Sequence, residues 1–528
     1  MSRAPLYFSL GAIAVLTLTP VIAYRGTRAP STDKSLIIVT PHNEQIRSEF
    51  SAAFSRWHQE KHGEQVEVAW STPGGSSEIR QLLVAQYESA LRNGQPVGGD
   101  ADILLGGGSY EFDAMCRPIT IGTGATQRST TILDRCDWMT QAQLDEIYGE
   151  NAIDGRPLYD PQHHWFGAAL STFGIISNVG ELSERSLSTP KVWADLAAPS
   201  LFEKVALANP AQSGSVATAF ETILQRLGWK RGWQILRRAA ANTNQIVGSS
   251  SLVPALVAKG ESWTGISIDF YGRYQVQAMA DAATATGIPS LKRIEFSTPK
   301  GESVVDADPV AILRGAPNPE LARSFVLFCL SMEGQTLWQL PHGEGKLCGY
   351  FRPIEYSLRR MPARRAAYEC CETCFIDQMN PFDDQSPLVS DSNFRDFVAT
   401  IFVPLAISNT DLLRRAWLAI HSHPDYPHHD GIVGSEDVSD PTLKHWLELF
   451  DRLPTIEGPN GTTLDLNSPK DLPTIRKGWL KGGFAQDGLW KDPEQPRTIM
   501  RRRFNAFFEN QYREIIESSE SLAALPIQ

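Results

Sequence analysis

The sequence predicts a layered α/β protein that carries a mainly helical C-terminal extension. Short apolar or β-branched runs, which are typical of buried strands, alternate with amphipathic helical segments over roughly the first 340 residues. Several of these runs end in loops rich in Gly and Ser. From about residue 352 the alternation stops, and helical patterns separated by loops with Pro and His take its place.

The opening third alternates between strands and helices. Strands are predicted at residues 36–39, 66–70 and 102–105, and helices at residues 44–61 and 78–92. In the first helix, Phe50, Phe54 and Trp57 fall on one face at helical spacing, which predicts packing against a core.

Strands and helices are predicted in the same way for the middle of the chain and for the extension. Further strands are predicted at residues 165–176, 204–207 and 263–268, and helices at residues 213–227, 232–241, 253–259 and 319–332. The extension is predicted to hold helices at residues 394–405, 412–421, 443–453 and 498–518. The last helix has an apolar stripe from Met500 to Ile515, which indicates core packing or, alternatively, a docking face for a partner.

Composition excludes several classes of protein. The chain has 528 residues, of which 42% are hydrophobic and 21% charged, so it is neither wholly disordered nor collagen-like. The formal net charge of -11 argues against a protein that coats nucleic acid. We therefore expect several globular units and no nucleic-acid partner.

Residues 1–28 read as an export signal or a membrane anchor. Arg3 precedes an apolar stretch from Leu6 to Ala23, and basic residues return at Arg25 and Arg28. The stretch is nearly long enough to cross a bilayer if it is not cleaved. We expect a periplasmic or extracytoplasmic location, with attachment to the membrane through this segment if it is retained.

Seven cysteines follow, and some should be paired in an exported protein. We expect Cys116 to pair with Cys136, and Cys348 to pair with one member of the cluster from Cys370 to Cys374. The CxxC spacing of Cys371 and Cys374 also occurs in redox and zinc sites, but no second CxxC or following His supports that role.

Four loops each follow a predicted strand and precede a predicted helix. In open α/β sheets, ligands bind beyond the carboxyl ends of the strands. Free N–H groups at helix starts favour anions, Ser hydroxyls add donors, and Gly allows close approach of a ligand. The alternative is that these residues are ordinary caps and turns. The candidate ligand-binding residues are His42, Asn43, Gly75, Ser76, Ser77, Gly108, Ser109, Ser213, Gly214 and Ser215.

Two further candidates, Tyr271 and Arg273, follow the strand predicted at residues 263–268. A phenol can hydrogen-bond to a ligand, stack against it or, as phenolate, bind a hard trivalent metal. Arg273 can pair with an anion in bidentate fashion. The alternative is that Tyr271 is a half-buried structural residue at a strand end.

A His-rich stretch contains His421, His423, His428 and His429. Imidazole suits transition metals, but the spacing matches no familiar zinc motif, and nearby prolines mark a loop. The sequence also lacks GxSxG, a Walker loop and a GxGxxG after a strand. We therefore expect no enzyme and no cofactor, and an exported metal-dependent hydrolase is kept only as an alternative.

In their order and spacing, these elements resemble the extracellular solute-binding proteins of ABC importers, and they are most similar to the branch that holds ferric-ion, thiamine and phosphonate binders. The resemblance covers roughly residues 36–340. The stretches that carry it include IIVTPHNE at 37–44, ADIL at 101–104, FGIISN at 173–178, WADL at 193–196, ANP at 208–210, SGS at 213–215, VAKGE at 257–261 and ADPVAIL at 307–313.

The resemblance implies a two-lobed type II periplasmic-binding-protein fold, in which the ligand lies between the lobes and a hinge closes them. The implied division is lobe 1 at residues 36–165 with 297–345, lobe 2 at residues 166–296, and an extension at residues 352–528. Iron-binding relatives use a His or Glu near the first strand and two adjacent Tyr after a later strand. His42 and Tyr271 fit a ferric site, but Phe270 stands where the second Tyr is expected, so an oxyanion or phosphorylated small molecule is an equal alternative.

From the resemblance we expect the monomeric substrate-binding component of an ABC transporter. Such a protein captures a small polar or anionic solute, or ferric ion, and delivers it to the membrane permease. The long extension leaves another alternative, a membrane-anchored extracytoplasmic sensor or scaffold built on a binding-protein fold.

Overall fold

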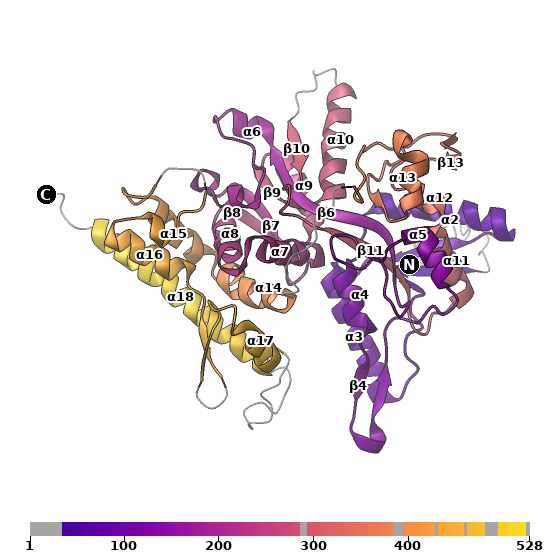
Figure 1. The fold of residues 1–528 in the computed structure, drawn as a ribbon, viewed down its shortest axis with the longest axis horizontal. Helices are drawn as coiled ribbons and strands as arrows, with labels where there is room; N and C mark the ends of the chain where they lie inside the picture. The colour runs from indigo at the N-terminus through magenta and orange to yellow at the C-terminus, as the bar shows by residue number, and fades with distance from the viewer. Residues whose placement is uncertain are drawn as a thin grey trace, which may run out of the picture.

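The computed structural model describes residues 34–285, 293–383, 394–427, 431–458, 462–480 and 495–523. The predicted signal or anchor at residues 1–28 lies outside the described residues, as do His428 and His429 of the His-rich stretch. Figure 1 shows an elongated α/β body flanked by the helices of the extension. The predicted fold class is confirmed.

A sheet of ten strands forms the centre of the described chain, in the order β2-β1-β3-β11-β6-β9-β7-β8, with β10 and β14 also paired to β6. Its strands are β1 (Ser35–Val39), β2 (Glu67–Ser71), β3 (Ile103–Leu105), β6 (Phe166–Asn178), β7 (Val205–Ala208), β8 (Thr243–Val247), β9 (Thr264–Ile268), β10 (Ile294–Ser297), β11 (Val305–Ile312) and β14 (Met361–Pro362). The strands β1, β2 and β3 pair in parallel, as do β7, β8 and β9. The sheet therefore has two parallel halves.

Strand β6 joins the two halves. All of its 13 residues are buried, which agrees with its nearly continuous apolar sequence. Its first part pairs with β11, from Phe166 to Thr172, and its second part pairs with β9, from Phe173 to Ser177. We call the half around β1–β3 lobe 1 and the half around β7–β9 lobe 2. The residue boundaries given above for the lobes stay a prediction.

Helices cover both halves of the sheet (Figure 1). Lobe 1 holds α2 (Glu44–His62), α3 (Ser76–Asn93), α4 (Ser109–Cys116), α5 (Gln141–Tyr148), α11 (Pro319–Leu330) and α12 (Met332–Thr336). Lobe 2 holds α6 (Val179–Ser183), α7 (Gly214–Leu227), α8 (Trp229–Ala241), α9 (Val253–Ala258) and α10 (Asp269–Ala285). The predicted apolar face of α2 is confirmed, since Phe50 and Phe54 are buried against Phe328 and Phe325 of α11. Two short strands, β4 (Ile119–Ile121) and β5 (Arg128–Thr130), form a hairpin beside α3.

The extension divides between the two lobes. Its first part pairs β14 with β6 and places α13 (Arg365–Cys371) against α12 and α5 of lobe 1. Its second part packs on α7 and α8 of lobe 2 and consists mainly of α14 (Arg395–Phe402), α15 (Thr410–His421), α16 (Pro441–Asp451), α17 (Leu472–Ile475) and α18 (Gln495–Ala523). Figure 1 shows these two parts on opposite sides of the molecule.

Buried contacts join the second part of the extension to lobe 2. Arg238 of α8 is fully buried, and its Nη1 lies 2.5 Å from Asp451 Oδ1 on α16. On α18, Phe504 and Phe508 are at most 1% exposed. The apolar stripe of this helix therefore packs into the core, as the first of its two interpretations predicted.

The predicted cysteine pairs have different outcomes. Cys348 and Cys374 form a disulfide, as expected. The predicted bond between Cys116 and Cys136 is wrong, because both are free thiols. Cys116 ends α4 beside Asp160 and His164, whereas Cys136 is buried in a loop where its N–H donates to the carbonyl of His163.

Within the described residues, no single helix has the length and apolar character to span a membrane. Two consecutive helical segments, Arg395–Ile407 and Thr410–His421, are together long and apolar enough to span one, but a 74° bend separates them.

Candidate functional site

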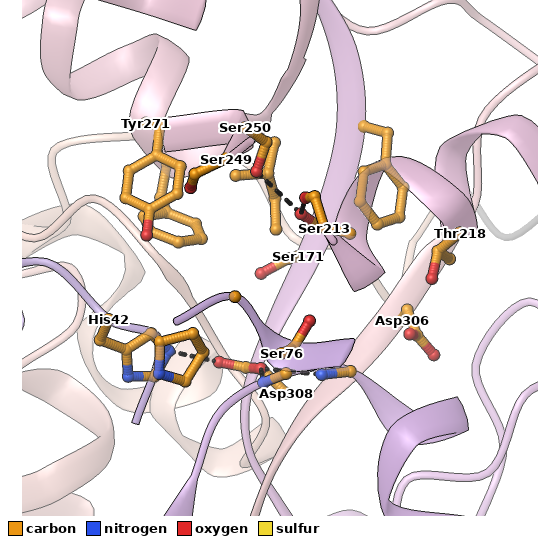
Figure 2. Close-up of a pocket in the computed structure, with 18 of the residues that line it drawn as sticks. His42, Ser76, Ser171, Ser213, Thr218, Ser249, Ser250, Tyr271, Asp306 and Asp308 are labelled. Atoms are coloured by element: carbon orange, nitrogen blue, oxygen red, sulfur yellow. Dashed lines mark hydrogen bonds and ion pairs between the residues drawn. The ribbon is translucent and has the colours of Figure 1, made fainter. Parts of the chain in front are cut away.

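A cavity of about 320 Å³ lies between the two lobes. The loops that follow β1, β2, β3 and β7 all reach it, because the carboxyl ends of these strands face the gap. Figure 2 shows the two sides facing each other, with Ser213, Ser249, Ser250 and Tyr271 on one side and His42, Ser76 and Asp308 on the other.

Hydrogen bonds cross the gap between the lobes. The backbone N–H of Gly214, at the start of α7, donates to Ser76 Oγ at the start of α3 over 3.1 Å. The side-chain amide of Gln212 donates to Glu78 Oε1 over 3.2 Å. The structure is therefore a closed arrangement, in which the N-termini of α3 and α7 meet at the cavity.

Hydroxyl groups line the lobe 2 side. Ser213 and Ser215 lie 3.1 Å apart, and Ser215 and Ser250 lie 2.8 Å apart, measured between their Oγ atoms. A hydroxyl both donates and accepts, so such a chain can reorient to suit the polar atoms of a ligand. Thr218, one turn further along α7, adds another hydroxyl to the lining.

A buried charged group forms the opposite side. Asp308 accepts hydrogen bonds from the N–H groups of Gly107 and Gly108 over 2.7 and 3.2 Å, and it lies 2.6 Å from Arg360 Nη1. Burial alone would raise the pKa of Asp308, but Arg360 and His42 outweigh that effect and hold it well below its usual range. Asp308 therefore stays ionised and fixes the loop after β3.

The positive φ angles of Gly107 and Gly108, 133° and 84°, allow both N–H groups to reach one carboxylate oxygen. Side chains other than Gly rarely adopt this backbone. The glycines after β3 thus shape the cavity through their backbone.

The two ring nitrogens of His42 differ in their hydrogen-bond partners. Its Nε2 lies 2.8 Å from both Asp308 Oδ2 and Arg360 Nη1, whereas its buried Nδ1 has no hydrogen-bond partner within the described residues. Burial lowers the pKa of His42, and the charge of Arg360 lowers it further, against the opposing effect of Asp308. His42 is therefore neutral at pH 7, and its tautomer decides whether Nδ1 donates or accepts.

Asp306 contributes a second carboxylate to the lining. It accepts a hydrogen bond of 2.6 Å from Ser109 Oγ, and its Oδ1 lies 3.6 Å from Arg156 Nη1. Its neighbour on the cavity surface, Ser171, accepts from Arg360 Nη2 over 2.8 Å. These groups can accept hydrogen bonds from hydroxyls of a ligand.

Aromatic rings close one end of the cavity. Tyr271 lies in the first turn of α10, with its ring 4.2 Å from that of Phe270. Burial raises the pKa of Tyr271 to about 12, so its side chain is a neutral phenol at physiological pH. In Figure 2 its hydroxyl points to the side of the cavity where His42 lies.

The structure places seven of the predicted residues in the cavity lining, namely His42, Gly75, Ser76, Gly108, Ser213, Ser215 and Tyr271. Five others have different roles. Asn43 caps α2, Ser77 donates to Glu111, Ser109 donates to Asp306, Gly214 donates to Ser76, and Arg273 lies near Asp269 and Asp377.

Sequence reasoning missed several lining residues, chiefly Ser171, Thr218, Ser249, Ser250, Asp306, Asp308 and Arg360. A signal existed for Asp306 and Asp308, because two carboxylates inside an otherwise apolar strand are unusual. No comparable signal existed for Arg360, which belongs to the extension and reaches the cavity only because β14 pairs with β6.

Comparison with known families agrees with this geometry. Residues 138–342 match the family described as bacterial extracellular solute-binding protein. The matched segment is less than half of the chain. The matched segment contains β6, β7, β9 and β11, and with them Ser213, Tyr271, Asp306 and Asp308 of the cavity.

The chain is also similar to curated proteins. The chain is 28% identical over 169 residues to the phosphoglycerate transport regulatory protein PgtC of Salmonella typhimurium, which is 32% of this chain and 39% of that protein. It is 28% identical over 176 residues to an uncharacterized protein of Haemophilus influenzae, which is 33% of this chain and 47% of that protein. The matches thus span less than half the length of these curated relatives.

Among solved structures, the fold is similar to the periplasmic binding protein AfuA from Actinobacillus pleuropneumoniae, at 17% identity and a TM-score of 0.49, covering 73% of this chain and 98% of that one. It is also similar to iron-bound HitA from Pseudomonas aeruginosa, at 17% identity and a TM-score of 0.45, covering 67% and 93%.

Proposed function

We propose that the protein captures a small, hydroxyl-bearing anion, best a phosphorylated one, in the cavity between its lobes, and delivers it to a membrane permease. The observation that carries this proposal is the convergence of two helix N-termini and a chain of hydroxyls on one cavity. The N-termini of α3 and α7 supply N–H groups and the positive ends of two helix dipoles, both of which favour an anion.

The carboxylates of the cavity fit the remainder of such a ligand. Asp308 is neutralised by Arg360 and held by backbone N–H groups, so it does not repel an anion as a free carboxylate would. Asp306 and Ser171 lie beside it and can accept hydrogen bonds from ligand hydroxyls. The name of the relative PgtC, which refers to phosphoglycerate transport, supports the same class of ligand.

The ferric-ion alternative has less support. Binding of ferric ion by Tyr271 requires a phenolate, and the burial that raises its pKa to about 12 opposes that form. Phe270, its neighbour, offers no oxygen. We infer that Tyr271 instead donates or accepts a hydrogen bond as a phenol.

A second candidate function is a sensor or scaffold outside the cytoplasm. The extension favours it, because Arg395 of α14 contacts Glu111 of lobe 1 and Thr218 of lobe 2 at once. A segment that contacts both lobes changes its surroundings when the lobes open. In this role the same solute would be the signal.

Isothermal titration of the full chain tests the proposal. The probes are 2-phosphoglycerate, 3-phosphoglycerate, fructose 6-phosphate and inorganic phosphate. Glycerate and fructose are the controls that lack the phosphate group, and ferric citrate tests the ferric-ion alternative. We expect binding of at least one phosphate ester and none of its dephosphorylated partner. Binding of ferric citrate alone would contradict the proposal.

Variants locate the binding. Ser213→Ala removes a hydroxyl at the start of α7, and a hydrogen bond to a charged group contributes about 1.5–3 kcal/mol, so we expect affinity to fall by about 10- to 150-fold. Ser188→Ala is the matched control, because Ser188 is exposed and lies outside this cavity. Equal affinity in both variants would place the ligand elsewhere.

A further inference from the structure

A second group of ligand-type side chains lies at the far end of α4 from the cavity. Cys116, Asp160 and His164 each offer one ligand atom, and these atoms all lie within 4.8 Å of one another. Cys116 is the last residue of α4, whereas Asp160 and His164 belong to the turn that leads into β6. The group therefore joins a lobe 1 helix to the strand that connects the lobes.

The turn holds its two ligand residues firmly. Asp160 Oδ2 accepts hydrogen bonds from the backbone N–H of His164 over 3.0 Å and lies 2.6 Å from His164 Nδ1. The carbonyl of Asp160 accepts from the N–H of His163 over 2.8 Å. Because His164 Nδ1 and Asp160 Oδ2 lie side by side, both can face one cation in place of the hydrogen bond between them, with Nδ1 as the imidazole ligand atom.

The surroundings of the thiol are short of positive charge. The carboxylates of Asp160 and Asp113 act on the Cys116 thiol, and Arg117 is the opposing charge. Asp113 lies one turn before Cys116 on α4 and accepts a hydrogen bond from Trp165 Nε1 over 2.9 Å. A divalent cation at this place would offset the carboxylate charge and release the thiol proton to solvent, because a coordinating thiol is deprotonated.

We propose that Cys116, Asp160 and His164 bind a divalent transition metal ion, best Zn²⁺, with a water molecule in the fourth position. One thiolate, one imidazole and carboxylate oxygen form a donor set that zinc takes in tetrahedral geometry. Its bonds of about 2.0–2.3 Å place neighbouring ligand atoms roughly 3.3–3.8 Å apart. Side-chain rotations reach that spacing from the separations of up to 4.8 Å seen here.

The other candidate cluster, His423 with Asp425 and Asp440, does not carry a similar proposal. The Asp425 side chain is 68% exposed, and Asp440 Oδ1 already accepts from two N–H groups that begin α16. It also lacks a sulfur ligand. This cluster instead provides a control for the experiment below.

Cobalt serves as the probe, because thiolate ligation to Co²⁺ gives a strong charge-transfer absorption that carboxylates and imidazoles do not produce. The full chain is stripped with a chelator, titrated with Co²⁺ and then with Zn²⁺ in competition. We expect one equivalent of thiolate-bound cobalt, displaced by Zn²⁺. Cys116→Ser should abolish the thiolate band, and His164→Asn should raise the dissociation constant by at least about 100-fold.

Controls separate this site from other thiols and histidines. Cys370→Ser, which removes an exposed free thiol, and His423→Ala should both retain the band. Far-ultraviolet circular dichroism checks that each variant is folded. If a variant does not fold, Asp160→Asn, which keeps the shape of the side chain, is used in its place. The proposal is overturned if the wild type shows no thiolate band, if the band survives in Cys116→Ser, or if it is lost in Cys370→Ser or His423→Ala.

Discussion

Arg395 is the residue whose removal should reveal how strongly the extension holds the lobes together. Its side chain is buried between them, with Nη2 2.9 Å from both Glu111 Oε1 and the carbonyl of Gly214, and Nη1 2.8 Å from Thr218 Oγ1. Glu111, on α4, is also buried and keeps a second partner in Arg80. Burial alone would raise the pKa of Glu111, but Arg395 and Arg80 outweigh it and hold that pKa below its ordinary value.

We expect Arg395→Met to lower the free energy of unfolding by about 3 kcal/mol. Removing one member of a buried ion pair costs about 3–5 kcal/mol. Because Arg80 still balances part of the charge of Glu111, we expect a loss near the lower end of this range. Urea unfolding followed by circular dichroism measures the change, with the slope against urea expected to stay constant. In the double variant Arg395→Met with Glu111→Gln, the loss should be smaller than the sum of the single losses.

The matched control is Arg415→Met. Arg415 also pairs with a glutamate, Glu520, at 2.9 Å, but both side chains are more than half exposed. Exposed pairs of this kind contribute about 1 kcal/mol or less. Equal losses in the two variants, or full additivity in the double variant, would refute the argument that burial between the lobes gives the Arg395 pair its strength.

Other predictions concern stability and pH. Because the pKa of His42 is lowered in the folded state, the unfolded state binds more protons below about pH 6.5, so stability falls on acidification, and His42→Gln should show a shallower fall between pH 7 and 5 in thermal unfolding. The ion pairs of Glu111 stabilise the fold above the pKa of an unfolded glutamate, about 4.3, and this stability is lost as the pH falls through the lower pKa of Glu111 in the folded state. Glu111→Gln should therefore reduce the loss of stability on acidification. Reduction of the Cys348–Cys374 disulfide, whose cysteines are 26 residues apart, should cost about 3.5 kcal/mol, and an unchanged melting temperature under reductant would contradict this. Because the stripe of α18 packs into the core, Phe508→Ala should lower the free energy of unfolding by about 3–5 kcal/mol, and an unchanged free energy of unfolding would contradict this.

Local patterns were sufficient to predict most of the fold. The apolar runs at β1, β3, β7 and β9 are buried strands, because such runs leave few other ways to hide their side chains. The short strand β14 and the division of the extension between the lobes were not predictable, since both depend on contacts between residues far apart in the sequence. The pairing of Cys116 with Cys136 failed for a related reason, because a count of cysteines carries no geometry.

The candidate site was predicted in part. Loops between a strand and a helix place Ser76 and Ser213 at the cavity because parallel strands bring their carboxyl ends to one edge. Arg360 and Arg395 could not be found this way, since each reaches its partners from a segment with no glycine-rich loop or strand signal. Among the described residues, the lack of a hydrogen-bond partner for His42 Nδ1 likewise depends on contacts that local patterns do not show.

The position of Arg360 has a practical bearing on how the protein can be divided. The family match ends at residue 342, yet the guanidinium that balances Asp308 lies 18 residues beyond that point. A fragment cut at the family boundary would keep the acid and discard its counter-charge, together with β14 and the hydrogen bond to Ser171. Such a fragment should be unstable and its cavity incomplete, so experiments on ligand binding need the extension as well as the lobes.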